Sequence, residues 1–123
     1  MKIYKTKWLA KFAKSEQIND ASLKEAIDRA KKGLIDADLA GGLIKQRVAR
    51  MGQGRSGGFR TVIAYKSGER AVFIYAFAKN ERENLSPNEL MDFRRIGKLW
   101  LETSTENMAT KIKDGLIEEI DYE

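Results

Sequence analysis

Residues 60–77, RTVIAYKSGERAVFIYAF, decide the fold class of this chain. Residues 60–65 and 71–77 are rich in β-branched and aromatic side chains, and residues 66–69 between them are polar and include a glycine. Two such runs around a short polar segment are typical of two β-strands joined by a hairpin turn. The second run is apolar throughout, which predicts a strand in the centre of a sheet.

The register of this hairpin decides which polar side chains share a face of the sheet. A two-residue turn at Ser67 and Gly68 places Arg60 opposite Tyr75 and puts Lys79 on the same face, two pairs further on. A three-residue turn would shift the pairing by one residue and move Tyr75 to the other face relative to Arg60. The two-residue turn therefore predicts one surface that carries Arg60, Tyr75 and Lys79.

The segment before the hairpin, residues 45–60 (KQRVARMGQGRSGGFR), is basic and rich in glycine. It contains five basic residues, no acidic residue, and four glycines within seven positions. Residues 43–49 alternate between apolar side chains and the basic side chains of Lys45 and Arg47, as expected of a strand with one face in water. The glycine-rich loop therefore joins two strands and does not open a helix, which excludes a P-loop for nucleotides.

Helices are predicted nearer the N-terminus. Apolar side chains along residues 8–13 indicate a brief amphipathic helix, which follows a short edge strand at residues 2–5. Ser22 and Glu25 form the pattern of a capping box, so a second helix is expected to begin there and to end at Gly33.

A third helix start is expected at residues 85–90, LSPNEL. Ser86 is the predicted N-cap, the proline occupies the first helical position, and Glu89 completes a capping box. Thr103 and Glu106 form the pattern of one more short helix.

These elements predict an α+β fold in a single domain over residues 1–123. N-terminal helices are expected to pack on a mainly antiparallel, twisted sheet, with a helix or helices after it. The chain length fits one domain. Residues 116–122 are expected to be either a strand or an acidic tail.

Composition excludes several classes of site. The chain has no cysteine and no histidine, so disulfides, thiolate nucleophiles, the usual zinc sites and imidazole acid–base chemistry are absent. We therefore expect neither a metal nor a cofactor. Residues 1–17 carry charges every few positions and lack the apolar run of a signal peptide or membrane helix, so we expect a cytoplasmic protein with no membrane partner.

Charge is distributed unevenly along the chain. Residues 43–70 hold seven basic residues and one acidic residue, whereas residues 114–123 hold five acidic residues and no basic one. A polyanion is expected to bind the middle of the chain and to be repelled by its end. The acids of that end, Glu118, Glu119, Asp121 and Glu123, are expected to fold against the basic face, to help dock a partner, or only to keep the chain soluble.

The chain contains three short motifs: Lys45-x-Arg47, Gly52-x-Gly-Arg-Ser-Gly-Gly-x-Arg60 and Phe77-Ala-Lys-Asn-Glu81. Their order and the separations between them are as informative as the motifs themselves. With their strands and helices they resemble the RelE/ParE superfamily of type II toxin–antitoxin toxins, nearest the HigB-like branch. The resemblance covers about residues 3–101 and leaves residues 102–123 as a C-terminal extension with an acidic end.

This resemblance implies an endoribonuclease that cuts mRNA in the ribosomal A site. Its partners would be the ribosome, mRNA and a cognate antitoxin, in this branch usually a helix-turn-helix protein that also represses the operon. RNA supplies its own nucleophile, the 2′-OH. The protein must therefore orient that group, accept its proton, stabilise charge on the phosphoryl oxygens and protonate the leaving 5′-oxygen, and none of this requires a metal.

The resemblance also implies roles for particular residues. Arg60 matches the family's transition-state arginine, and its planar fork suits a phosphate. Lys79 is placed like the family's basic residue after the apolar strand, where it would transfer a proton or neutralise a phosphate. Because Asn80 stands where some relatives have an arginine, the general acid remains to be chosen among Lys79, Tyr75 and Glu81.

A further set of residues fits a surface for the backbone of mRNA and ribosomal RNA. Its members are Lys45, Arg47, Arg50, Gln53, Arg55, Gly57 and Gly58. Two other functions stay open at this point: a ParE-like inhibitor of DNA gyrase, which shares the fold, and a nucleic-acid-binding module without catalysis.

Overall fold

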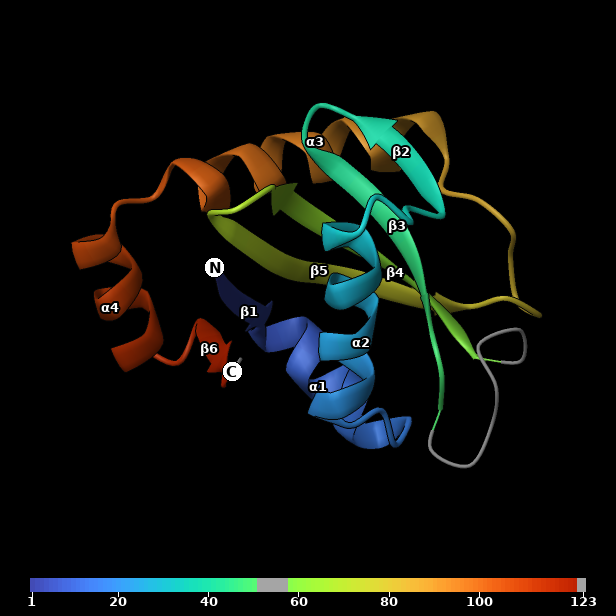
Figure 1. Ribbon diagram of the computed structural model, residues 1–123, viewed down its shortest axis with the longest axis horizontal. Coiled ribbons are helices and arrows are strands. Elements are labelled where there is room, and N and C mark those ends of the chain that lie inside the picture. The colour runs from blue at the N-terminus through green and yellow to red at the C-terminus, as the bar shows by residue number, and fades with distance from the viewer. Residues whose placement is uncertain (51–57, 122–123) are drawn as a thin grey trace.

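The computed structural model describes residues 1–50 and 58–121, which form one six-stranded sheet and four helices (Figure 1). The α+β class predicted from the sequence is confirmed. In chain order the elements are β1 (Lys2–Thr6), α1 (Lys7–Ser15), α2 (Asp20–Lys31), β2 (Ala37–Ala40), β3 (Leu43–Val48), β4 (Phe59–Lys66), β5 (Arg70–Ala78), α3 (Pro87–Glu102), α4 (Thr105–Lys113) and β6 (Ile117–Ile120).

The sheet has the strand order β2-β3-β4-β5-β1-β6, and only the pairing of β1 with β5 is parallel. The apolar strand β5 lies in the interior of the sheet, as predicted. The prediction that the first strand is an edge strand is wrong, because β1 lies between β5 and β6 and buries Ile3 and Tyr4. The short strand β2, which forms one edge, was not predicted.

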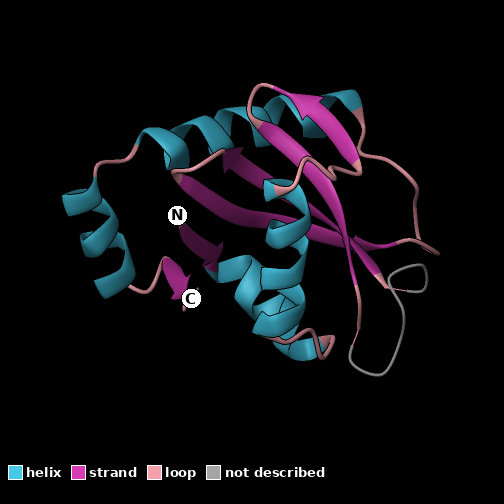
Figure 2. Cartoon of the chain, in the orientation of Figure 1, coloured by secondary structure: helices cyan, strands magenta, loops and turns pink. Residues whose placement is uncertain are grey.

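Helices cover both faces of the sheet, as the cartoon in Figure 2 shows. On one face α1 and α2 pack against β3, β4 and β5 around Leu9, Ile27 and Phe73. On the other face α3 lies against β3, β4 and β5. Gly97 permits this close approach, because a Cβ atom there would lie 3.1 Å from the Leu43 side chain and 3.2 Å from the Ala64 side chain.

The start of α3 follows the sequence closely. The Ser86 side chain accepts from the Glu89 N–H and the Glu89 side chain accepts from the Ser86 N–H, so the predicted capping box is present. The predicted caps of the other two helices are wrong. Asn19 caps α2 ahead of Ser22, and Ser104 caps α4 while Thr103 ends α3. In both cases the cap is the polar residue directly before the first helical residue, where the chain turns into the helix.

The hairpin between β4 and β5 differs from the predicted one. Lys66 pairs with Arg70, so three residues form the turn instead of two. A second register shift occurs between Val62, which pairs with Tyr75, and Ile63, which pairs with Phe73. Ile74 is therefore an extra residue on β5 with no partner on β4. As a result Arg60 lies opposite Phe77 and not opposite Tyr75.

Because there are two one-residue shifts, Tyr75 still lies on the predicted face of the sheet. Tyr75 pairs with Val62, two residues along β4 from Arg60, and side chains two residues apart on a strand share a face. Tyr75 therefore lies on the same side of the sheet as Arg60. The predicted opposite neighbour was wrong, but the predicted common face is correct for this pair.

Within the acidic end of the chain, residues 117–120 form strand β6 of the sheet. β6 pairs with β1, buries Ile117 and Ile120, and places Glu119 2.9 Å from the Nζ of Lys2. It lies at the opposite edge of the sheet from β2 and β3. The expectation that Glu118 and Glu119 fold against the basic strands is therefore wrong, whereas a role in docking a partner stays a prediction. Glu123 lies outside the described residues.

Candidate active site

Strand pairing gathers three basic side chains on the face that carries α3. Arg47 on β3 lies directly opposite Arg60 on β4, and Lys45 lies opposite Val62. Phe77, which lies opposite Arg60, belongs to the core beneath α3 and so fixes the side of the sheet. Lys45, Arg47 and Arg60 form what we call the basic face.

Arg60 holds a charge that the protein only partly satisfies. Its Nη1 atom is buried and has no hydrogen-bond partner among the described residues. Burial lowers the pKa of Arg60, repulsion from Arg47 lowers it further, and Asp36 raises it in part. An arginine stays protonated at any physiological pH, so the group is a cation with unused donor capacity. Such a group is suited to an incoming anion.

Asp36 makes it possible for two arginines to lie side by side. Its carboxylate accepts from the Arg47 backbone N–H at 2.7 Å, from Arg47 Nη2 at 3.0 Å and from Arg29 Nη1 at 3.1 Å. Burial alone would raise the pKa of Asp36, but the hydrogen bonds from Arg47 and Arg29 outweigh burial and lower it. The carboxylate is therefore charged at neutral pH and holds the Arg47 side chain in place.

Two buried polar residues fix Asp36 in turn. Arg29 on α2 also donates to Glu25 at 2.8 Å and to the Arg47 carbonyl. Gln46 is fully buried; its Nε2 donates to the carbonyls of Ala26 and Leu34, and its Oε1 accepts from the Asp36 N–H at 2.7 Å. The sequence analysis missed this support. The available signal was Gln46 itself, a polar residue in the apolar row of β3.

An aromatic wall adjoins the basic face. The Tyr75 ring lies 4.7 Å from the Trp8 ring and 4.9 Å from the Phe93 ring, measured between centroids, and is half-buried. Trp8 stacks in turn on Phe12 of the same helix. Tyr75 is thus held between α1 and α3 and packs partly as a core residue.

A cation missed by the sequence analysis, Arg82, lies in the turn after the C-terminal end of β5. The chain turns after Ala78 and brings the Arg82 guanidinium 5.5 Å from the Phe77 ring centroid. Arg82 donates to both carboxylate oxygens of Glu89 and to the carbonyl of Asn84. The Asn84 side chain accepts from Lys45 Nζ at 3.1 Å, so this turn contacts the basic face.

The ion pair between Arg82 and Glu89 shifts the pKa of both groups. Hydrogen bonds from Arg82, with a further one from the Ser86 N–H, lower the pKa of Glu89 to about 2. Hydrogen bonding to Glu89 raises the pKa of Arg82, and the Tyr75 hydroxyl contributes in the same direction. The signal for Arg82 in the sequence was its position directly after the motif that ends at Glu81.

Lys79 and Glu81 occupy the turn that follows β5. Both side chains are exposed, and neither makes a hydrogen bond or ion pair with the described residues. Lys79 is two residues beyond Phe77, the partner of Arg60. A role for Lys79 and Glu81 at a ligand bound by Arg60 stays a prediction.

The remaining candidates do not join this group. Arg50 donates to Glu16 at 2.7 Å and lies 5.0 Å from the Phe59 ring centroid, on the face that carries α1 and α2. At Gly58 an added Cβ atom would lie 2.1 Å from the Val48 carbonyl oxygen, so this glycine allows close approach of β3 and β4. The other three candidates, Gln53, Arg55 and Gly57, lie outside the described residues.

The basic face offers charge and hydrogen-bond donors. Within residues 1–50 and 58–121 no group of three or more His, Cys, Asp or Glu side chains is placed to hold a metal ion. Over the same residues no helix is both long and apolar enough to cross a membrane. Cations with forked donors, held rigidly beside one another, can bind phosphate and stabilise charge that develops on it.

Comparison with known proteins identifies the family. A search of curated proteins finds no match to the sequence. The sequence model for the RelE toxin of RelE/RelB toxin–antitoxin systems matches residues 1–120, and the chain therefore belongs to the RelE toxin family.

Proposed function

We propose that this toxin is a ribosome-dependent mRNA endoribonuclease that needs no metal and stops translation by cutting the message. The observation that carries the proposal is the buried, unpartnered Nη1 of Arg60 directly opposite Arg47. Two adjacent cations with one shared carboxylate leave the face short of negative charge. A phosphodiester supplies negative charge and can accept a hydrogen bond from the Arg60 guanidinium.

The proposed reaction uses the 2′-OH of the RNA as nucleophile. The 2′-OH gives its proton to a general base, for which Glu81 and Tyr75 are the candidates. Its oxygen attacks the phosphorus, the bond to the 5′-oxygen breaks, and a 2′,3′-cyclic phosphate and a free 5′-OH result. Arg60 stabilises the charge that builds on the phosphoryl oxygens, while Arg47 and Lys45 bind the neighbouring backbone. Lys79 gives a proton to the leaving oxygen, with Tyr75 and Glu81 as the competing candidates.

Primer extension on mRNA tests the proposal. The RNA would come from growing cells and from a translation reaction with ribosomes, each with wild type, Arg60→Ala or Arg50→Ala. Arg50→Ala is the matched control, because Arg50 lies on the other face and pairs with Glu16. We expect cuts that require ribosomes, a loss of about a hundredfold or more in Arg60→Ala, and near-normal cutting in Arg50→Ala.

Two results would overturn the proposal. Intact mRNA in arrested cells, together with inhibited supercoiling by purified DNA gyrase, would make the protein a ParE-like gyrase inhibitor. Intact mRNA in healthy cells would leave a binding protein without catalysis. Among active variants, Lys79→Ala, Tyr75→Phe and Glu81→Gln identify the general acid, which is the one whose loss removes the basic limb of the pH–rate profile.

A further inference from the structure

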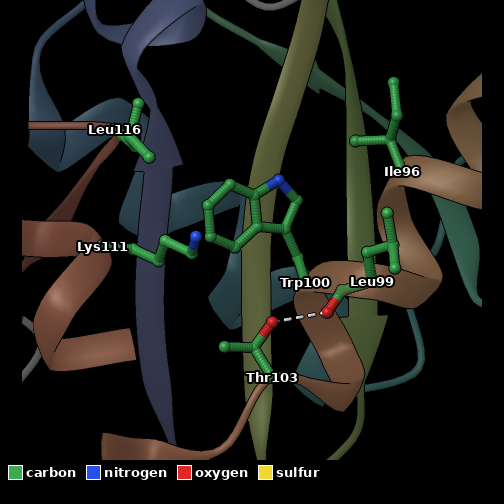
Figure 3. A pocket seen from close by; sticks show the side chains of 6 residues that line it. All are labelled: Ile96, Leu99, Trp100, Thr103, Lys111 and Leu116. Atoms are coloured by element: carbon green, nitrogen blue, oxygen red, sulfur yellow. Dashed lines mark hydrogen bonds between the residues drawn. The ribbon is translucent and has the colours of Figure 1, made fainter. Parts of the chain in front are cut away.

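An apolar groove runs beside α3, separate from the basic face. One part is a cavity of about 470 Å³ between α1 and α3, and a second part of about 350 Å³ continues it toward α4. The two parts share Ile96, Trp100 and Leu116, so they form one groove. Figure 3 shows the Trp100 ring between Ile96 and Leu99 of α3 on one side and Lys111 and Leu116 on the other. We call this the tryptophan groove.

The groove gathers an unusual share of the protein's exposed apolar side chains. Seven large apolar side chains are exposed among the described residues, and four of them line the groove. These four are Trp8, Ile96, Leu99 and Leu116. Leu99 alone is 65% exposed. A contiguous apolar patch of this kind marks a surface that another molecule covers.

The charges of the groove have a single sign. Lys7 and Lys111 are the charged residues that line it, and no acidic residue does so. Asp92 on α3 is already paired with Arg95 at 3.3 Å. A partner that fits this lining presents apolar anchors to the tryptophans and carboxylates to the two lysines.

We propose that the tryptophan groove binds an acidic, amphipathic segment of the antitoxin. The family pairs each toxin with an antitoxin, and the groove supplies the apolar floor and the basic rim that such a segment requires. Tyr75 lines the groove and also lies on the same side of the sheet as Arg60. A segment in the groove therefore contacts the aromatic wall of the candidate active site.

Charge and apolar contact can be tested separately with matched variants. Calorimetry would measure binding of the purified antitoxin to the full-length toxin. Leu99→Glu is expected to weaken binding about tenfold or more. The control is Met91→Glu, at an apolar residue of α3 that is similarly exposed (57% against 65% for Leu99) but lies outside the groove, and it is expected to change binding less than about twofold. Lys111→Glu is expected to weaken binding, and Lys113→Glu on the same helix is not.

The two tryptophans of the chain give a direct readout, because Trp8 and Trp100 both line the groove. Toxin labelled with 5-fluorotryptophan should give two ¹⁹F resonances, and both should shift on addition of antitoxin. Equal effects of Leu99→Glu and Met91→Glu, or unshifted resonances in a formed complex, would overturn the proposal.

Other occupants give different results. Self-association of the toxin alone that Leu99→Glu abolishes would assign the groove to a second copy of this chain. Impaired mRNA cutting by Leu99→Glu without antitoxin would assign it to RNA. The inference rests on the family's pairing with an antitoxin and not on cleavage, so the binding measurement remains decisive even if mRNA stays intact.

Discussion

Two guanidinium groups on neighbouring strands repel each other, and Asp36 offsets that repulsion. It bonds to both the backbone and the side chain of Arg47, and it lies close enough to Arg60 to raise its pKa. Asp36 thus holds Arg47 and Arg29 by hydrogen bonds, while Nη1 of Arg60 keeps no partner among the described residues. The balance of charge on the basic face therefore depends on Asp36.

Asp36→Asn should therefore impair both folding and cleavage. The amide keeps the shape but loses the negative charge, so Arg47 and buried Arg29 lose charge-assisted bonds. We expect the free energy of unfolding to fall by about 1–3 kcal/mol and cutting to fall about tenfold or more, for the fraction that remains folded. Urea denaturation and primer extension measure the two effects.

Asp38→Asn is the matched control for this change. Asp38 accepts from the Ala40 N–H at 2.8 Å, a bond that an asparagine oxygen can also accept. Similar losses in both variants would show that Asp36 has no special role at the basic face.

Gly58→Ala should destabilise the fold for a steric reason. The new Cβ atom would lie 2.1 Å from the Val48 carbonyl oxygen, a backbone atom that can move only with β3. We expect a loss of about 1–3 kcal/mol or more in the free energy of unfolding. Gly68→Ala, at a φ of +76° with open space around it, should lose about 1–2 kcal/mol through backbone strain alone. A smaller loss at Gly58 than at Gly68 would contradict this explanation.

Single residues also show where sequence patterns mislead. Gln46 occupies an apolar row, and only the structure shows that its amide reaches three backbone groups from two other segments. Arg82 lies next to a recognised motif, but its position depends on a turn that pattern analysis does not place. The partners of Gln46 lie 10 to 20 residues away in the sequence. Those of Arg82 are nearer but lie across an irregular turn, so no periodic pattern encodes either contact.

Among the elements, α3 is fixed at its start by an ion pair as well as a capping box. Glu89 belongs to both, since its carboxylate accepts from the Ser86 N–H and from Arg82. This double use ties the turn after β5 to the helix. It also makes the start of α3 sensitive to acid.

Glu89→Gln isolates the charge, because glutamine also completes a capping box. The folded-state pKa of Glu89 is about 2, below its ordinary value of 4.5. Its charge therefore contributes stability that is fully present above about pH 4.5 and is lost as the pH falls toward 2. Wild type should lose more stability than Glu89→Gln over that interval, and the difference between the two proteins should be constant from pH 6 to pH 8.

Thermal unfolding at a series of pH values measures this effect. Glu106→Gln, in the first turn of α4, is the control, because Glu106 has no ion pair among the described residues. If Glu89→Gln and Glu106→Gln follow the same pH profile, the ion pair with Arg82 does not stabilise α3.

The sequence predicted some elements better than others. The capping box of α3 and the apolar run of β5 are local and strong, so they were predicted correctly. β2 has only four residues with weak alternation, and it exists because β3 offers it a partner. The hairpin register failed for a related reason, since the extra turn residue and the shift at Ile74 follow from how both faces of β5 pack.

For the whole molecule, strand order separates the charges. The basic face lies on β3 and β4, while the acidic strand β6 lies at the far edge beyond β5 and β1. An RNA strand can therefore bind the first region without approaching the second. The sequence indicated uneven charge, but only the strand order shows where in space each part lies.

The salt dependence of binding should identify which cations contact phosphate. For a programmed ribosome, Arg47→Gln should reduce the slope of log K against log salt by about 0.7, the value for one phosphate contact on a single strand. Arg50→Gln should leave the slope unchanged, because Arg50 lies on the other face and pairs with Glu16. Equal slopes for Arg47→Gln and wild type would remove Arg47 from the RNA-binding surface.

The parallel pairing of β1 with β5 has a consequence for synthesis. β1 pairs through Lys2 with Arg70 and through Ile3 with Ile120, residues that are made much later than β1 itself. It must wait, unpaired, until residues made much later have left the exit tunnel. The ribosome that makes this toxin therefore carries an unfinished sheet throughout most of translation. The sheet can be completed only after β6, the last of its described strands, has been made.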